Sequence, residues 1–267
     1  MDILEKIVTN KLNEVSRQKK AVPLELLLSS GEQRLNRPIV SMRSSLSQSK
    51  SGIIAEFKRR SPSKGWLHRD AKIDDVLTAY EQNGASACSI LTDGDFFGGS
   101  FSDLTKARAL VRLPLIRKDF IIDDYQLYQA RVMGADAVLL IAACLTRSKC
   151  RNLAATAHRL GMEVLLEIHS EYDLSYLNPN IDMIGVNNRN LGTFDTDVEN
   201  SFRMIEKINP TSDSPLLVSE SGISDPALIR RLRSVGYRGF LIGETFMKTP
   251  RPGDALLQFI NQLSQSS

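Results

Sequence analysis

Glu56 and Lys58 are the residues of this sequence whose types and spacing point most clearly to chemistry. They stand at the end of an apolar run, Ile53–Phe57, that predicts a β-strand, and side-chain alternation puts both on the same side. A carboxylate and an ammonium group side by side at a buried strand end cost stability, so the pair favours a functional site. The loop that follows, Arg59–Gly65, is basic and contains serine and glycine, which suits an anionic ligand.

Polar residues recur where the later apolar runs end. A single charge at such a position is usually solvated or ion-paired, but the same pattern on several runs favours a shared cavity. Lysines close to carboxylates can act as general acids and anion clamps, and a glutamate on the opposite wall can act as the base. Glu220 could instead be a structural partner of neighbouring cations. In chain order these ends carry Thr92-Asp93, Arg117-Lys118-Asp119-Phe120, Glu167, Asn187-Asn188-Arg189, Ser219-Glu220-Ser221-Gly222 and Gly243-Glu244.

Three phenylalanines accompany these polar residues. Phe96 and Phe97 lie in the loop FFGGS after the second run, and Phe120 follows the third. They could wall in a flat aromatic group or belong to the core, and their positions leave both interpretations open.

The elements that would position these side chains alternate from Gly52 onward. The apolar runs that predict strands are Ile53–Phe57, Ala87–Leu91, Leu115–Lys118, Ala137–Ile141, Glu163–Ile168, Met183–Asn187, Leu216–Glu220 and Gly239–Gly243. Helical periodicity between and after them predicts helices over Ile73–Gln82, Leu104–Val111, Asp124–Met133, Ser148–Leu160, Glu199–Ile208, Pro226–Val235 and Ala255–Leu263. The runs are apolar on both faces, as in a parallel sheet covered by helices. Eight strand–helix units predict an α/β fold, the TIM (β/α)8 barrel.

An open, doubly wound sheet is the alternative fold. That fold binds ligands at one switch point, whereas polar residues here end many runs, and no GxGxxG or Walker A motif follows any run. The barrel is therefore favoured, because the ends of all its strands meet at one mouth. Ser221-Gly222 and Gly243-Glu244 then fall at the strands where many barrels bind phosphate through backbone N–H groups.

The first 51 residues predict a helical extension. Apolar residues from Ile3 to Val15 recur at helical spacing, a short helix over Leu24–Leu28 stops at Gly31, and the polar stretch Asn36–Ser51 predicts a connecting segment. These residues are too few for a core of their own. We therefore expect a single domain, 1–267, made of an N-terminal helical extension, 1–51, and a barrel, 52–267.

Composition indicates an ordinary globular protein, and its small positive charge fits an anionic small substrate if that charge gathers in one cleft. The 267 residues are 42% hydrophobic and 24% charged, and the net charge of +3 is too small and scattered to favour nucleic acid. The three cysteines lack metal-ligand spacing, and Cys88 and Cys144 are expected to be reduced core residues. The longest apolar run is too short to cross a membrane, and the charged N-terminus is unlike a signal peptide. A cytoplasmic location is therefore expected.

Ordered motifs along almost the whole chain resemble those of the indole-3-glycerol-phosphate synthase family of tryptophan biosynthesis. They are AEFKRRSPSKG at 55–65, LTD and FFGGS at 91–100, RKDFIIDDYQ at 117–126, GADAVLLIAA at 134–143, EVLLEIHS at 163–170, IGVNNRNL at 184–191, VSESGI at 218–223 and LIGETFM at 241–247. The resemblance implies a carboxy-lyase that needs no metal or other cofactor. Its reaction would be ring closure, decarboxylation and dehydration of 1-(2-carboxyphenylamino)-1-deoxyribulose 5-phosphate.

The resemblance also assigns roles to residues of this chain. Lys118 would be the general acid and Glu167 the general base, and the other catalytic residues would be Glu56, Lys58, Asn187 and Ser221. The predicted substrate-binding residues are Ser61, Phe97, Phe120, Arg189, Gly222, Gly243 and Glu244. Glu244 stands where some members have serine, so its carboxylate would have to point away from the phosphate. We expect a monomer or weak homo-oligomer, whose N-terminal helices could cover the mouth or contact another tryptophan-pathway enzyme.

Two rival functions fit the residue types less well. A sugar-phosphate isomerase barrel would use a Cys–Asp or Asp–Asp pair on the first and fifth strands, where this chain has Glu56, Lys58 and Glu167. A barrel that binds a phosphorylated ligand without turnover would have no need of an acid and a base together. Both alternatives are therefore disfavoured.

Overall fold

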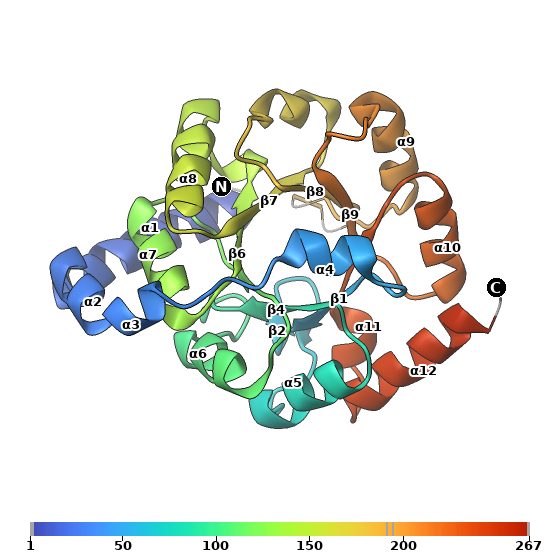
Figure 1. Cartoon of the computed structure of the whole chain (residues 1–267), viewed down its shortest axis with the longest axis horizontal. Coiled ribbons are helices and arrows are strands. Elements are labelled where there is room, and N and C mark those ends of the chain that lie inside the picture. The colour runs from blue at the N-terminus through green and yellow to red at the C-terminus, as the bar shows by residue number, and fades with distance from the viewer. Residues whose placement is uncertain (1–2, 191, 194, 266–267) are drawn as a thin grey trace.

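Eight parallel strands close into a barrel that is surrounded by helices (Figure 1). The computed structural model describes residues 3–190, 192–193 and 195–265, so Leu191 of the IGVNNRNL motif and the outermost residues of the expected domain lie outside it. The barrel strands are β1 (Ile53–Phe57), β4 (Ala87–Leu91), β5 (Leu115–Lys118), β6 (Ala137–Ile141), β7 (Glu163–Ile168), β8 (Met183–Asn187), β9 (Leu216–Glu220) and β10 (Gly239–Ile242). Pairing of β10 with β1 closes the barrel. The predicted TIM barrel is confirmed, and only the last strand ends one residue earlier than predicted.

Helices between the strands cover the outside of the barrel. They are α5 (Ile73–Gln82), α6 (Phe101–Leu110), α7 (Asp124–Met133), α8 (Arg147–Arg159), α9 (Glu199–Ile208), α10 (Pro226–Ser234), α11 (Glu244–Met247) and α12 (Pro252–Ser264), with 3-10 turns η1 (Ala142–Cys144) and η2 (Glu171–Tyr176). Helices α6 and α12 begin three residues before their predicted starts, because the Ser100 cap and Pro252 begin them ahead of the apolar periodicity. Helix α7 ends as predicted at Gly134, which has a φ of 101°.

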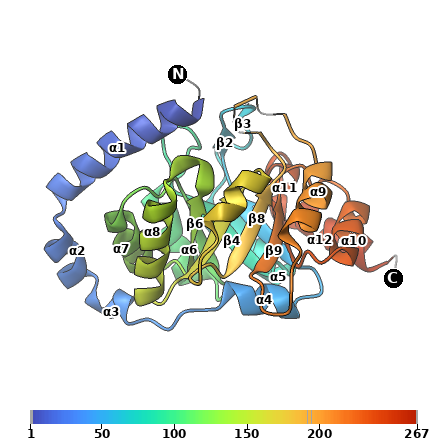
Figure 2. The same cartoon turned by 90° about the horizontal axis from the view of Figure 1, so that it is seen from above.

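The N-terminal helices lie at both ends of the barrel. Helix α1 (Ile3–Ala21) lies on the side of the hairpin formed by β2 (Arg60–Ser61) and β3 (Gly65–Trp66), whereas α4 (Met42–Gln48) crosses the opposite end (Figure 2). Helices α2 (Leu24–Ser30) and α3 (Glu32–Leu35) connect them. The prediction of a connecting segment over Asn36–Ser51 is wrong for α4. Two apolar residues in a polar stretch gave no periodicity, but both, Met42 and Leu46, are fully buried at the foot of the barrel.

Side-chain alternation along the strands separates two apolar layers. On β1, Ile53, Ala55 and Phe57 pack in the layer under the helices, whereas Ile54 belongs to the cluster inside the barrel. The inner row is mostly apolar below its last position, with Ser89 on β4 and Glu163 on β7 as polar members. On five strands a polar side chain occupies that last position: Glu56, Lys118, Glu167, Asn187 and Glu220. The alternation of side chains along each strand therefore places these five polar side chains at the mouth of the barrel.

The structure confirms the predicted burial of one cysteine and not of the other. Cys88 is fully buried as predicted, but Cys144 is only partly buried because it lies in the η1 turn just beyond β6. Within residues 3–190, 192–193 and 195–265, no helix is long and apolar enough to cross a membrane.

Candidate active site

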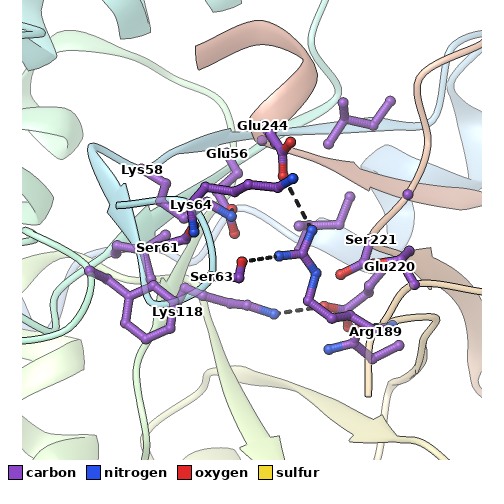
Figure 3. Close-up of a pocket in the computed structure, with 18 of the residues that line it drawn as sticks. Glu56, Lys58, Ser61, Ser63, Lys64, Lys118, Arg189, Glu220, Ser221 and Glu244 are labelled. Carbon is purple, nitrogen blue, oxygen red and sulfur yellow. Dashed lines mark hydrogen bonds and ion pairs between the residues drawn. The ribbon is translucent and has the colours of Figure 1, made fainter. Parts of the chain in front are cut away.

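A cavity of about 680 Å³ opens at the carboxyl ends of the strands (Figure 3). Every predicted site residue lines it: Glu56, Lys58, Ser61, Phe97, Lys118, Phe120, Glu167, Asn187, Arg189, Ser221, Gly222, Gly243 and Glu244. Glu220 lines it as well; it was among the strand-end residues expected at the mouth, and a structural role as a partner of cations was the other interpretation. The structure therefore brings together residues from all eight strands and the loops that follow them, including Leu139 and Ile141 of β6.

Glu56 and Lys58 form an ion pair, with 2.6 Å between Oε1 and Nζ. Glu56 is 2% exposed, and its Oε2 accepts a hydrogen bond from Ser89 Oγ at 3.4 Å. The carboxylate fits because residue 243 is glycine: a Cβ there would lie 2.4 Å from Glu56 Oε1. Gly243 therefore has a steric role toward Glu56 in addition to the predicted contact with phosphate.

Lys118 is held between two carboxylates. Its Nζ lies 2.6 Å from Glu220 Oε2 and 3.1 Å from Glu167 Oε2. Burial by itself lowers the pKa of Lys118, but the negative charges of Glu220, Glu167 and Glu56 outweigh it and raise the pKa above its ordinary value. Lys118 is therefore a charged ammonium group at neutral pH.

Glu167 is a buried carboxylate with several partners. Its Oε1 accepts a hydrogen bond from Asn187 Nδ2 at 3.1 Å, and His169 Nε2 lies 3.5 Å away. Burial favours the neutral acid, but Lys118, His169 and the hydrogen bond from Asn187 outweigh burial and lower the pKa of Glu167. Glu167 is therefore an ionised group able to accept a proton.

Glu220 differs from Glu167 although both contact Lys118. Burial, with the nearby charges of Glu167 and Glu56, raises the pKa of Glu220 to about 7, and Lys118 only partly offsets this. Its Oε1 has no hydrogen-bond partner among the described residues and faces Gly185, where a Cβ would lie 2.0 Å from it. Glu220 reaches the cavity by the same alternation as Glu56, because both occupy the last inward position of a strand.

An aromatic pair forms another wall of the cavity. The ring centroids of Phe97 and Phe120 are 5.9 Å apart and the ring planes are inclined by 39°. Phe97 comes from the loop after β4 and Phe120 follows β5. Phe96 packs against the apolar cluster inside the barrel and does not line the cavity.

Arg189 ties together three segments around the rim. Its guanidinium donates to Ser63 Oγ at 2.7 Å and to Glu244 Oε2 at 3.2 Å (Figure 3). Ser63 lies between strands β2 (Arg60–Ser61) and β3 (Gly65–Trp66), which turn the predicted loop into a small antiparallel hairpin. The carboxylate of Glu244 is thus paired with a cation.

The turn after β9 completes the rim. Ser221 has a φ of 68° and Gly222 of 78°, so two successive residues adopt the left-handed conformation. At Gly222 a Cβ would lie 2.6 Å from Thr196 Cγ2, which makes glycine necessary for the close approach of the preceding loop. Ser61 Oγ, on the hairpin, accepts the backbone N–H of Lys64 at 3.2 Å and is otherwise directed at the same cavity.

A closed barrel whose strand ends carry a lysine between two carboxylates defines the class of (β/α)8-barrel enzymes with acid–base chemistry. Comparisons with known proteins specify it further. A family model described as indole-3-glycerol phosphate synthase matches residues 4–259. The indole-3-glycerol phosphate synthase of Bacteroides thetaiotaomicron is 58% identical over 264 residues, which cover 98% of this chain and 99% of that protein. The chain belongs to the indole-3-glycerol phosphate synthase family.

Other relatives and solved structures agree with this placement. The indole-3-glycerol phosphate synthase of Polaromonas sp. is 44% identical over 260 residues, covering 96% of this chain and 97% of that protein. A mutant tryptophan synthase alpha-subunit from Pyrococcus furiosus is 13% identical, with a TM-score of 0.61 over 80% of this chain and 98% of that one, and shows the fold alone. Family membership makes the chain a carboxy-lyase of tryptophan biosynthesis and decides against the isomerase and the non-catalytic binder.

Proposed function

We propose that the cavity at the barrel mouth is the active site, with Lys118 as the general acid and Glu167 as the general base. The observation that carries this proposal is the position of Lys118 Nζ, 3.1 Å from Glu167 Oε2 and 2.6 Å from Glu220 Oε2. The raised pKa of Lys118 keeps a proton available, and the lowered pKa of Glu167 keeps a carboxylate free to accept one. Acid and base are then both in the protonation states that the reaction needs.

Ring closure uses the charge of Lys118. The ring carbon that bears the carboxylate of the substrate attacks the ketone carbon, and negative charge develops on the ketone oxygen. Lys118 stabilises that oxygen and donates a proton to it from a largely buried position, where the charge of the ammonium group is weakly screened. The bond to the carboxylate then breaks, carbon dioxide leaves, and the electron pair of that bond restores the aromatic ring.

Dehydration uses the base. The new hydroxyl leaves as water with a proton from Lys58 or Lys118, while Glu167 removes the proton whose loss forms the indole double bond. Asn187 Nδ2 orients the Glu167 carboxylate by donating to Oε1, and Glu56 holds Lys58 at 2.6 Å. Ser221, which lines the cavity in the turn after β9, would border the reacting carbons.

The walls of the cavity suit the three parts of the substrate. Phe97 and Phe120 would contact the aromatic ring, and Arg189 and Lys58 would pair with its carboxylate. Ser61, Gly222 and Gly243 would bind the phosphate from the hairpin and from the turns after β9 and β10. Glu244 would keep Arg189 extended across the rim until the substrate carboxylate competes for it.

Lys118→Ala tests the central assignment. We expect turnover to fall roughly 10²–10⁴-fold, because the acid and the charge that stabilises the alkoxide are both lost. The appearance of indole fluorescence from 1-(2-carboxyphenylamino)-1-deoxyribulose 5-phosphate measures it. Lys106→Ala, on the exposed face of α6, is the matched control. Near wild-type turnover of a folded Lys118→Ala variant would overturn the assignment.

The organisation of the chain is part of the proposal. We take residues 1–267 as a single domain, with the extension over 1–51 serving the barrel over 52–267. A monomeric or weakly self-associating state, a contact with other tryptophan-pathway enzymes and a cytoplasmic location stay predictions of the sequence.

A further inference from the structure

Lys11 is a fully buried lysine on a helix outside the barrel. It lies on α1, with 0% of its surface exposed, and its Nζ is surrounded by three carboxylates. Glu14 Oε2 lies at 2.7 Å, Asp119 Oδ1 at 2.9 Å and Asp93 Oδ2 at 3.0 Å. A lysine on a surface helix ordinarily keeps its ammonium group in water, so this burial requires an explanation.

The two aspartates belong to the segments that carry the aromatic wall. Asp93 directly follows the residue after β4, and its Oδ1 accepts the backbone N–H of Phe96, next to Phe97. Asp119 directly follows Lys118, and its Oδ1 accepts the backbone N–H of Phe120 at 2.8 Å. Lys11 therefore joins the backbone before Phe97 to the backbone between Lys118 and Phe120.

The charges around Asp119 are balanced only when Lys11 is present. Asp119 Oδ2 accepts hydrogen bonds from Thr92 Oγ1 at 2.5 Å and Arg117 Nη2 at 2.9 Å. Asp93 and Asp119 are both fully shielded from solvent, and Arg117 and Lys11 supply the matching positive charges. Without Lys11 one buried aspartate charge would be uncompensated, and the segments holding it would have to move toward water.

Helix α1 also contributes apolar surface at the same place. Ile7, one turn before Lys11, is 4% exposed and belongs to the same apolar cluster as Phe96, Phe97 and Phe120. Lys11 and Ile7 therefore face the mouth together, and the ion pairs fix where this face of α1 lies.

We propose that Lys11 is a positioning residue for the reaction: it fixes the two backbone segments that present Phe97, Phe120 and Lys118 to the substrate. This inference rests on the proposed function, because it takes the phenylalanine pair to bind the aromatic ring. Lys11 itself does not line the cavity.

Lys11→Met removes the charge and keeps the length of the side chain. We expect KM to rise roughly tenfold, with a smaller fall in kcat, because the aromatic wall contributes mainly to binding. Lys19→Met is the matched control, since Lys19 on the same helix pairs with Asp123 at an exposed site. Its kinetic constants should stay within about twofold of wild type.

Trp66 provides a spectroscopic readout in the free protein. It is the single tryptophan of the chain, and it packs against Gly98, where a Cβ would lie 3.0 Å from its ring. The hairpin that carries it also bonds to the wall, since the Arg60 N–H donates to the Phe97 carbonyl. We expect Lys11→Met to red-shift Trp66 emission and increase its quenching by acrylamide, and Lys19→Met to change neither.

The double variant Lys11→Met/Asp93→Asn separates positioning from charge balance. The amide oxygen introduced at position 93 can still accept the Phe96 N–H, and the loss of one negative charge compensates for the loss of Lys11. This variant should therefore fold even if Lys11→Met does not. We expect it to keep the raised KM and the altered Trp66 emission. Wild-type KM and emission in either folded variant would overturn the inference.

Phe97→Leu distinguishes this inference from the proposed function. If Phe97→Leu raises KM while both Lys11 variants leave it unchanged, the aromatic wall binds substrate and the assignment of Lys11 is wrong. If Phe97→Leu has no effect on KM, the proposed role of the wall is wrong, whatever the Lys11 variants do.

Discussion

Replacement of Glu220 by glutamine should remove a specific pH dependence from the stability of the protein. Glu220 is 1% exposed, and burial together with the charges of Glu167 and Glu56 raises its pKa to about 7 from an ordinary 4.5. Glutamine has the shape of the protonated acid but cannot ionise. Its side-chain oxygen can still accept the hydrogen bond that Lys118 donates to Glu220 at 2.6 Å.

The sign and size of the effect follow from linkage. The unfolded chain releases the Glu220 proton near pH 4.5, whereas the folded protein holds it until about pH 7. Between these values the folded state binds more protons, so its stability must fall as pH rises. At 1.36 kcal/mol for each unit of pKa, the total loss is about 3 kcal/mol by pH 8. The carboxyl groups with lowered pKa values, Asp119, Asp123, Glu167 and Asp197, act below this window.

Urea unfolding curves at a series of pH values from about 5 to about 8 measure this loss. The quantity compared is the free energy of the first unfolding transition at each pH. The wild-type protein should lose stability across the series, and Glu220→Gln should lose about 2.5 kcal/mol less, because part of the loss has already occurred by pH 5. Glu206→Gln, on the exposed face of α9, is the control and should follow the wild type. Parallel curves for Glu220→Gln and the wild type would refute the assignment of a protonated Glu220 to the folded state.

Two further substitutions test the geometry of the cavity. Glu167→Gln should slow dehydration roughly 10²-fold with little change in KM, measured by single-turnover kinetics, and a change confined to KM would contradict its role as base. Gly243→Ala should displace Glu56, because the new Cβ would lie 2.4 Å from Glu56 Oε1, and should cost roughly 1–3 kcal/mol of stability together with turnover. Gly94→Ala is the control, because its Cβ would lie 3.6 Å from the nearest atom. Tm and kcat are measured for both variants, and equal effects would argue against the steric role of Gly243.

The barrel and the site residues on its strands could be predicted because local pattern and global fold agree. Each strand is a short apolar run bounded by polar residues, and glycines such as Gly134 mark where helices end. The pleat then determines which residue of each strand end points inward, so Glu56 and Lys118 could be assigned to one cavity before their distances were known.

Features that depend on contacts distant in sequence could not be predicted in this way. Helix α4 is stabilised by burial of Met42 and Leu46 against the foot of the barrel, and its own sequence is mostly polar. Lys11 likewise belongs to a charged helix and has no local signal, because its partners Asp93 and Asp119 lie far along the chain. The hairpin around Ser63 has only two residues in each strand, too few for any periodicity.

The contacts around Lys118 indicate which of its two carboxylate neighbours is ionised. Two neighbouring carboxylates in a buried site cannot both be fully ionised at low cost. The one with more hydrogen-bonding and charged partners stays ionised. Glu167 has Asn187 and His169 as additional partners, whereas Glu220 has an oxygen with no hydrogen-bond partner among the described residues. Of the two, Glu220 is thus the carboxyl group that takes up a proton more readily. Its neighbour Glu167 remains ionised, as its proposed role as the base requires.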